Sequence, residues 1–375
     1  MSSAGAAPGP ATGERLAART RSLIDVPSVS RDEAALLDLI RGSLPGELDV
    51  LDDEDAVLFA VARAGGERPF VVLAGHVDTV PIAGNVPSTI EDGVVVGRGA
   101  SDMKGALAVM LELADRSSSH GGDFDVGFVF FGREELPFGD SALLPLFARC
   151  PTAGAPDLAI VMEPTGNAIE IGCLGNLNAT VTVRGRAAHS ARPWLGDNAI
   201  HRAIGALAPL ADLPSREVTI EGFTYHEVVS VTTIEGGSAA NVVPDRVDAR
   251  VNYRYAPGHA PEDAEARLRE LLAVPDVELR IDGNAPPGPV SAANPLVQAL
   301  REAGDLPVGA KQAWTPVAEF ALAGVDAVNF GPGDPRYAHR DDERVEVRSL
   351  ERSLEVLSTF LGLVPGSSRK GPMTA

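Results

Sequence analysis

Short apolar runs alternate with segments of helical periodicity through the first half of the chain. Four runs have the length and composition of buried strands, namely 56–64, 69–78, 125–132 and 156–164. Between the second and the third lies KGALAVMLELADR (104–116), whose apolar residues recur at helical spacing. This alternation predicts an α/β fold, in which helices cover both faces of a mixed sheet.

From about Asn176 the pattern changes to that of a smaller unit. Four strands and two helices are predicted here, in the order β-α-β-β-α-β that is typical of a ferredoxin-like domain. In chain order, the six segments are NATVTVRGR, NAIHRAIGALAPLA, EVVSVTTIEGG, DRVDARVNYRYAP, PEDAEARLRELLA and VELRID. The Gly/Pro-rich GNAPPGP then leads back to α/β patterning. We therefore expect one domain made of 13–175 and 284–364, interrupted by a domain spanning 176–283, with disordered tails at 1–12 and 365–375.

Charge and cysteine content restrict the binding partners and the cellular compartment that we expect. The net charge of −20 disfavours nucleic acid and anionic membranes as partners. Two cysteines in separate segments exclude a disulfide framework, which favours a reducing cytoplasm. Neither a secretory signal pattern nor an apolar run long enough to span a membrane is present, so we expect a cytoplasmic protein.

Imidazole and carboxylate side chains gather where predicted strands end. They are His76 with Asp78, Asp102, Glu134 with Glu135, Glu163, and His339 in a late loop. Singly each has an ordinary explanation, such as a core histidine, a helix N-cap or a solvated acidic turn. Ligands in α/β sheets collect beyond the carboxyl ends of strands, so the joint placement indicates a site.

The types of these side chains favour a metal. Imidazoles and carboxylates without cysteine suit Zn²⁺ at an open catalytic site, with Co²⁺ or Mn²⁺ as alternatives. Two imidazoles and three carboxylates suffice for two metals with one bridging carboxylate, a pair suited to polarising a carbonyl. A further glutamate then remains to carry a proton to a leaving nitrogen.

The motifs GHVDTVP, GRGASDMKG, GREE, EPT and a late AH resemble, in this order, the signatures of the M20 metallopeptidase and deacylase family. AHSARPWLGDNAIH, GGSAANVVPD and VNYRYAP are similar to its actinobacterial succinyl-diaminopimelate desuccinylase branch, and the resemblance covers roughly residues 15 to 362. It implies a zinc-peptidase-like catalytic domain, an inserted lid and dimerisation domain, and two Zn²⁺ per subunit.

The resemblance also assigns roles to the strand-end residues. His76 and Glu163 would bind one metal, Glu135 and His339 the other, and Asp102 would bridge them. Asp78 would orient His76, and Glu134 would be the general base. The bond Asp102-Met103 would be a cis peptide.

Four residues of the inserted domain match positions that act on substrate in the family. His189 would stabilise the oxyanion from the second subunit of a homodimer, although alone it reads as a surface histidine. Asn241 and Arg254 would grip the substrate, with Arg254 on a carboxylate, and Arg192 is a weaker candidate. An exposed strand-end arginine is the alternative reading of Arg254.

One stretch departs from the family pattern. Where the desuccinylases read roughly Gly-Trp-Thr-Asp-Val-Ala/Ser-Arg-Phe, this chain has AWTPVAEF (313–320). Pro316 replaces an acid, and Glu319 replaces an arginine that binds a substrate carboxylate. Glu319 either lines the pocket and favours an amine, a guanidine or a neutral group there, or faces solvent while another residue substitutes.

The resemblance thus implies a dinuclear zinc amidohydrolase that cleaves an N-acyl amine, N-succinyl or related, into a carboxylate and a free amine. An aminoacylase or dipeptidase is the alternative within the class, because its metal ligands are the same. A non-catalytic binding protein on this fold is the alternative of another class. It would require a lost ligand or base, whereas all of these positions are filled.

Overall fold

The structure is a computed structural model that describes residues 11–120, 122–273 and 276–363. It divides into two compact units. One contains the chain up to Ile171, 291–309 and everything from Glu319, and the other contains 172–290 and 310–318. Of the two expected disordered tails, the structure describes only residues 11 and 12, and Thr12 is the first residue of a helix. The other tail residues lie outside the described residues.

The first unit is built on an eight-stranded sheet of order β1-β2-β6-β3-β7-β17-β8-β16. Its strands are β1 (Asp49–Asp52), β2 (Val57–Ala62), β3 (Phe70–His76), β6 (Asp125–Phe131), β7 (Leu158–Val161), β8 (Ile169–Ile171), β16 (Val308–Ala310) and β17 (Ala327–Asn329). A smaller sheet joins β4 (Thr89–Glu91), β5 (Val94–Val96) and β18 (Arg344–Glu346).

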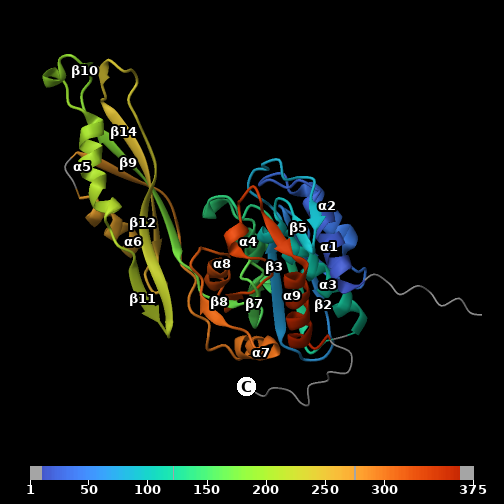
Figure 1. The fold of residues 1–375 in the computed structure, drawn as a ribbon. Helices are drawn as coiled ribbons and strands as arrows, with labels where there is room; N and C mark the ends of the chain where they lie inside the picture. The colour runs from blue at the N-terminus through green and yellow to red at the C-terminus, as the bar shows by residue number, and fades with distance from the viewer. Residues whose placement is uncertain (1–10, 121, 274–275, 364–375) are drawn as a thin grey trace, which may run out of the picture. The chain divides into compact units, whose positions relative to one another are not determined.

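The helices of this unit lie along the large sheet. They are α1 (Thr12–Ile24), α2 (Ala34–Ser43), α3 (Gly105–His120), α4 (Leu143–Arg149), α7 (Pro295–Gly304), α8 (Val317–Leu322) and α9 (Val347–Phe360). In Figure 1, α4 and α8 lie to one side of β3, and α1 and α3 lie to the other. The predicted α/β class with helices around a mixed sheet is confirmed.

The four strands predicted in the first half form the middle of this sheet. Every residue of β2 is buried, as are all but the first residues of β3 and β6, which explains their unbroken apolar sequences. β6, β3, β7 and β17 run parallel to their neighbours in that order. Because these strands point the same way, the segments that follow them emerge at one edge of the sheet.

The second unit is an antiparallel sheet of order β11-β12-β14-β9-β15 with two helices. Its elements are β9 (Gly175–Arg184), α5 (Ala199–Ala211), β11 (Arg216–Ile220), β12 (Phe223–Gly236), β14 (Arg246–Tyr255), α6 (Pro261–Leu271) and β15 (Val277–Ala285). The six predicted elements are present, and β11 is an additional strand. The helices and one sheet face bury a common apolar core.

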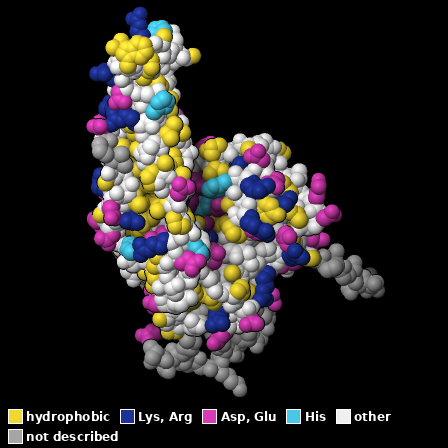
Figure 2. Space-filling view, turned by 60° about the vertical axis from the view of Figure 1, so that its left-hand side comes forward, with side chains coloured by type: hydrophobic (Ala, Val, Ile, Leu, Met, Phe, Trp, Pro, Cys, Tyr) yellow, Lys and Arg dark blue, Asp and Glu magenta, His cyan; other side chains and the backbone are white. Residues whose placement is uncertain are grey.

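A short two-stranded ribbon completes the second unit, formed by β10 (Ala188–His189) and β13 (Val242–Val243). Several large apolar side chains of the unit are exposed: Trp194, Leu195, Ile204, Val228, Val231 and Ile234. Figure 2 shows hydrophobic side chains (yellow) along the visible face of this unit. Among the described helices of the whole chain, none is long and apolar enough to cross a membrane.

Candidate metal centre

Two imidazoles converge on the carboxylate of Asp102 in the first unit. Nε2 of His76, the last residue of β3, lies 3.0 Å from Oδ1, and Nε2 of His339 lies 3.3 Å from Oδ2. Asp102 comes from the irregular turn Ala100–Lys104 before α3, where the Asp102-Met103 bond is cis as expected. Each oxygen of one carboxylate thus faces a different histidine, which is the arrangement required of a bridging ligand.

Two glutamates complete the pairs around Asp102. Glu163, which follows β7, has Oε1 3.8 Å from Nε2 of His76, and Glu135, in the turn after β6, has Oε1 3.1 Å from Nε2 of His339. Ligand atoms of His76, Asp102 and Glu135 all lie within 4.8 Å of one another. The five predicted metal ligands are therefore brought together, in the two groups expected from the sequence.

Asp78 fixes the orientation of the neighbouring groups. Its backbone carbonyl is 3.0 Å from Nδ1 of His76, whereas its nearer carboxylate oxygen is 3.7 Å away. An Nδ1–H that donates to this carbonyl leaves the lone pair of Nε2 directed toward Asp102. The predicted orienting role is thus served mainly by the backbone of Asp78.

The carboxylate of Asp78 has a further task that the sequence did not reveal. Its two oxygens accept hydrogen bonds from the backbone N–H groups of Glu134 and Glu135, both at 3.1 Å, and Oδ2 also accepts from the Ser30 hydroxyl at 2.7 Å. Although burial alone would raise the pKa of Asp78, His76 and these donors lower it. Asp78 therefore holds the glutamate turn against the end of β3.

The cluster carries more negative charge than its own residues can balance. Burial and the neighbouring acids raise the pKa of Glu134 well above its usual range, against the effect of His76. Hydrogen bonds to Asp102 and Glu135 raise the pKa of His339 to about 10. Burial opposes the protonation of His76, yet Asp102, Asp78 and Glu134 together raise its pKa well above normal. Several carboxylates that face two imidazoles in a largely buried cluster favour cations, so the donor set fits a pair of divalent metal ions.

Sequence reasoning missed an ion pair behind Asp102. Glu343 is buried, and its Oε1 accepts from the backbone N–H groups of Ser101 and Asp102 at 3.2 and 3.0 Å. Its Oε2 accepts from Nη1 of Arg98 at 2.9 Å. Arg98 precedes Asp102 by four residues and Glu343 follows His339 by four, and the sequence carries no signal that would pair them.

Arg133, beside the two glutamates, does not join the acidic cluster. Its guanidinium contacts the backbone oxygen and the carboxylate of Asp55, each at 2.9 Å. Its backbone is left-handed, with φ of 66°, where the chain leaves β6 and turns toward Glu134. Arg133 therefore braces the turn from outside.

The second unit brings three of its four candidate residues together. His189 pairs with Val242 in the ribbon, and the backbone N–H of Ser190 donates to the Asn241 carbonyl at 2.9 Å. Arg192 follows in the same turn, with its N–H donating to the His189 carbonyl at 2.7 Å. His189, Arg192 and Asn241 are all exposed.

Arg254 lies elsewhere in the same unit, near the end of β14. It is eight residues beyond Arg246 along this strand, which at about 3.3 Å per residue is roughly 26 Å. Arg254 is partly buried, and burial lowers its pKa. Its Nε donates to Asn252 at 2.9 Å, and no carboxylate forms an ion pair with it among the described residues. The alternative of a simply exposed arginine is wrong.

Glu319, at the departure from the family pattern, is fully buried in α8. Burial raises its pKa to about 7, and the Ser141 hydroxyl only partly opposes this effect. No cationic side chain forms an ion pair with it in the part of the chain that the structure describes. The expectation of a solvent-facing residue is therefore wrong.

Comparison with known proteins agrees with the geometry. The model of peptidase family M20/M25/M40 matches residues 72–362. The chain belongs to this family. A Mycobacterium tuberculosis protein with the provisional name succinyl-diaminopimelate desuccinylase is 39% identical over 346 residues, covering 92% of this chain and 97% of the relative. The succinyl-diaminopimelate desuccinylase of Corynebacterium glutamicum is 37% identical, covering 91% and 95%.

A solved structure shows the same fold at lower identity. It is a dinuclear metal-binding peptidase of the M20 family from Bacillus subtilis, with a TM-score of 0.66 and 16% identity, covering 94% of this chain and 97% of that one. With family membership established, the strand-end cluster is the place where metal-dependent chemistry is expected.

Proposed function

We propose that this M20 protein is a dinuclear metal-dependent amidohydrolase, which cleaves an N-acyl amino acid or amine into a carboxylate and a free amine. The observation that carries the proposal is the carboxylate of Asp102, whose two oxygens face His76 and His339 separately. A structural acidic patch has no need of this symmetry. A non-catalytic binding protein would also not need an additional glutamate at the cluster.

The residues that would hold the metals follow from the two pairs. His76 with Glu163 would bind one ion, His339 with Glu135 the other, and Asp102 would bridge them. We assign Zn²⁺ to both positions, with Co²⁺ or Mn²⁺ as alternatives, because the donors are nitrogen and oxygen without sulfur. When bound, such a pair polarises a substrate carbonyl and lowers the pKa of water.

Glu134 is the group that we assign to proton transfer. It would accept a proton from the attacking water and deliver it to the leaving nitrogen, which must be protonated to depart as an amine. The raised pKa of Glu134 suits a group that has to hold this proton between the two steps. Asp78 would position it through the N–H contacts of the glutamate turn.

The relatives support an N-succinyl or related substrate. Two of them, with more than nine tenths of the chain covered, carry the name succinyl-diaminopimelate desuccinylase. Arg254, which has no carboxylate partner among the described residues, is available for a substrate carboxylate. Glu319 supplies no such contact, so we propose a substrate choice altered from that of the named relatives, with an N-acylated amino acid or a dipeptide as the second candidate.

The separation of His189 from Arg254 supports a homodimer. The ribbon partner of His189, β13, ends at Val243, three residues before β14 begins at Arg246, and Arg254 lies roughly 26 Å further along β14. One substrate would therefore not reach both within one unit. We propose that a second copy supplies His189, with Asn241 beside it, and that His189 stabilises the oxyanion. Arg192 would assist at the same end.

The surface of the second unit offers an interface for that copy. Along β12, only Phe223–Glu227 pairs with β11, so among the described residues Val228–Gly236 leaves one edge open. Val228, Val231 and Ile234 are exposed there. An open edge with apolar side chains favours pairing with another strand.

The test is hydrolysis of a panel by metal-loaded protein. The panel contains N-succinyl-LL-diaminopimelate, N-succinyl and N-acetyl amino acids, and dipeptides, with Glu134→Ala protein as the blank. We expect about two metals per chain and release of free amine from one acyl class. Fewer than one bound metal, or equal turnover by the blank, would refute the mechanism.

The same panel tests the substrate choice separately. Turnover of N-succinyl-LL-diaminopimelate as fast as that of an established desuccinylase would contradict the altered specificity while leaving the reaction class intact. Release of the N-terminal residue from dipeptides alone would favour the peptidase alternative.

A further inference from the structure

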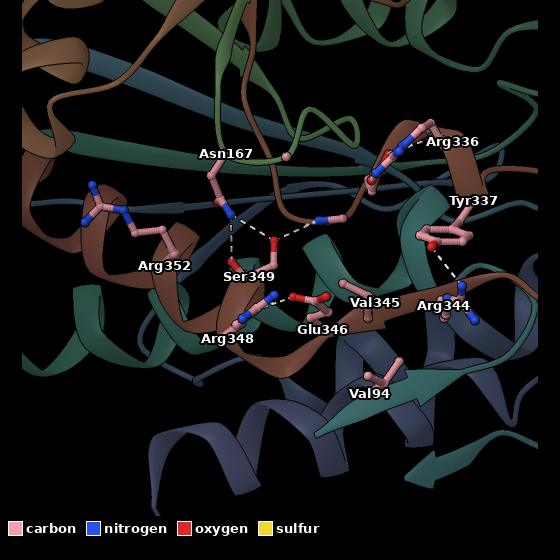
Figure 3. Close-up of a pocket in the computed structure, with 13 residues that line it drawn as sticks. Val94, Asn167, Arg336, Tyr337, Arg344, Val345, Glu346, Arg348, Ser349 and Arg352 are labelled. Atoms are coloured by element: carbon pink, nitrogen blue, oxygen red, sulfur yellow. Dashed lines mark hydrogen bonds and ion pairs between the residues drawn. The ribbon is translucent and has the colours of Figure 1, made fainter. Parts of the chain in front are cut away.

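A cavity of about 560 Å³ in the first unit is distinct from the metal centre. It lies between the start of α9, the loop Gly333–Tyr337 and the turn Gly166–Asn167, and none of the five candidate metal ligands lines it. Its volume lies within the range of small-molecule sites. Four arginines line it, namely Arg336, Arg344, Arg348 and Arg352, and Figure 3 shows them around the opening.

The charge of the cavity opposes that of the protein. The charged residues of its lining are the four arginines, Asp334 and Glu346, so four positive and two negative charges leave a net +2. Three of the arginines form ion pairs: Arg336 with Asp334, Arg348 with Glu346, and Arg352 with Glu355, which lies outside the lining. The whole chain carries −20. A local positive site on an acidic molecule attracts anions, while the rest of the surface repels them.

Arg344 is the arginine least neutralised by acids. Its guanidinium lies 4.2 Å from the ring centre of Tyr337, and Nη2 donates to the Tyr337 hydroxyl at 2.7 Å. The nearest carboxylate, Asp342, is 3.9 Å away and is already bound by Arg340 at 2.7 Å. The stacking fixes the guanidinium plane, so it needs little ordering to bind a ligand oxygen.

Ser349 supplies a neutral donor at the same cavity. Its hydroxyl oxygen accepts from Nδ2 of Asn167 at 2.8 Å and from the backbone N–H of Gly333 at 3.1 Å. The side-chain amide of Asn167 cannot exchange the positions of its nitrogen and oxygen without losing a hydrogen bond, because its Oδ1 accepts from the Ser353 hydroxyl. With both lone pairs engaged, the Ser349 hydroxyl can only donate, which selects a ligand that accepts hydrogen bonds.

We propose that this cavity binds a small anion of the phosphate type. Arginine forks match phosphate oxygens in two-pronged fashion, and the Ser349 hydroxyl adds a donor that a cation or an apolar ligand would leave unused. The N-terminus of α9 adds partial positive charge. At about 560 Å³ the cavity has room for a phosphate monoester as well as for the free ion.

The position of the cavity connects it to the metal centre through the backbone. Asn167 follows Glu163 by four residues, and Tyr337 precedes His339 by two. The backbone N–H of Gly166 donates to the Gly333 carbonyl at 2.7 Å, which joins the two loops. A bound anion would therefore contact both of the loops that carry these ligand residues.

Calorimetric titration of the full-length protein at constant ionic strength tests the proposal. Inorganic phosphate, ribose 5-phosphate and citrate are titrated into metal-loaded and into metal-stripped protein. We expect saturable binding of the phosphates in both forms, because the cavity contains no metal ligand. Tighter binding of ribose 5-phosphate would assign an organic phosphate, and equal binding the free ion.

Two neighbouring variants give effects of opposite sign. Arg348 is exposed and pairs with Glu346, so neither is needed to hold the fold. Arg348→Gln should weaken phosphate binding about tenfold, the loss typical of one charge-assisted hydrogen bond. Glu346→Gln should tighten it several-fold by removing a negative charge from the lining.

An exposed arginine outside the cavity serves as control. Arg41 of α2 pairs with Asp38 and Asp53, and Arg41→Gln should leave phosphate affinity unchanged. Binding that disappears on metal removal, equal affinity for citrate, or the same affinity in both cavity variants as in the wild type would overturn the proposal. Loss of hydrolytic activity would not, because the titration does not require turnover.

Discussion

The cluster of acids around Asp102 and the single buried acid Glu319, both in the first unit, differ in the hydrogen-bond and charge partners of their carboxylates. The acids around Asp102 lie against two imidazoles. Carboxylates of the same cluster also accept hydrogen bonds from the backbone N–H groups of Ser101, Glu134 and Glu135. Glu319 is equally buried, yet no cation pairs with it among the described residues, and its pKa rises to about 7. Burial of an acid is therefore no sign of a site by itself; convergence with imidazoles is.

The largest expected effect comes from Glu134. Glu134→Gln keeps the shape of the side chain but cannot accept a proton, so kcat should fall about 10²- to 10⁴-fold. Metal content and the melting temperature should stay close to those of the wild type. Steady-state kinetics with metal analysis measure both, and a loss of bound metal would instead make Glu134 a ligand.

Glu319 should affect stability through pH. Because its pKa of about 7 in the folded state exceeds the usual 4.5, the folded protein binds the proton more tightly than the unfolded chain does. The stabilisation that protonated Glu319 gives to the folded state at low pH is therefore lost as the pH rises from about 4.5 to 7. The difference of 2.5 pH units corresponds to about 3 kcal/mol.

A matched pair of variants isolates this contribution. Glu319→Gln should remove most of the pH-dependent loss between pH 5 and 8, whereas Glu47→Gln, at an exposed glutamate of the same unit, should not. Urea denaturation at the two pH values gives the free energies of unfolding. Parallel pH curves for the wild type and Glu319→Gln would show that Glu319 stays ionised in the fold.

Metal binding should stabilise the acidic cluster. At a free metal concentration about 100 times the dissociation constant, the gain is about 2.7 kcal/mol for one site. We therefore expect the melting temperature to fall on chelation and to recover on addition of Zn²⁺. In Asp102→Asn protein the Zn²⁺-dependent rise should be much smaller, and an undiminished rise would place the metal elsewhere.

The ion pair behind Asp102 should have a smaller but measurable effect. Glu343→Gln keeps the side-chain shape but weakens the hold on the Ser101 and Asp102 N–H groups. Groups that orient metal ligands typically change metal affinity 10- to 100-fold, and competition with a chromophoric chelator measures this quantity. Unchanged affinity would assign the pair to folding alone.

Much of the fold was predictable because its strands are unambiguous. β2, β3 and β6 are apolar at nearly every position, which only a covered sheet tolerates. β11 was missed because Arg216–Ile220 is only five residues long, has just two apolar side chains, and buries none of its residues, so the sequence does not distinguish it from a loop.

The gathering of the candidate ligand residues was predictable because chemistry restricts their types and sheet topology restricts their places. Groups that act on the backbone were not. Arg98 and Glu343 are 245 residues apart, and neither belongs to a metal-type pattern. The arginine cavity likewise joins Asn167 to Ser349, a contact that depends on how loops fold back on α9. The burial of Glu319 depends on packing that local sequence does not encode.

Asp78 positions two separate parts of the proposed reaction centre at once. Because one residue holds the imidazole of His76 by its carbonyl and the glutamate turn by its carboxylate, the proposed ligand and the proposed base are positioned by the same residue. Substitutions in the substrate-facing segments would therefore leave the distance between the proposed base and the proposed metal ligand unchanged.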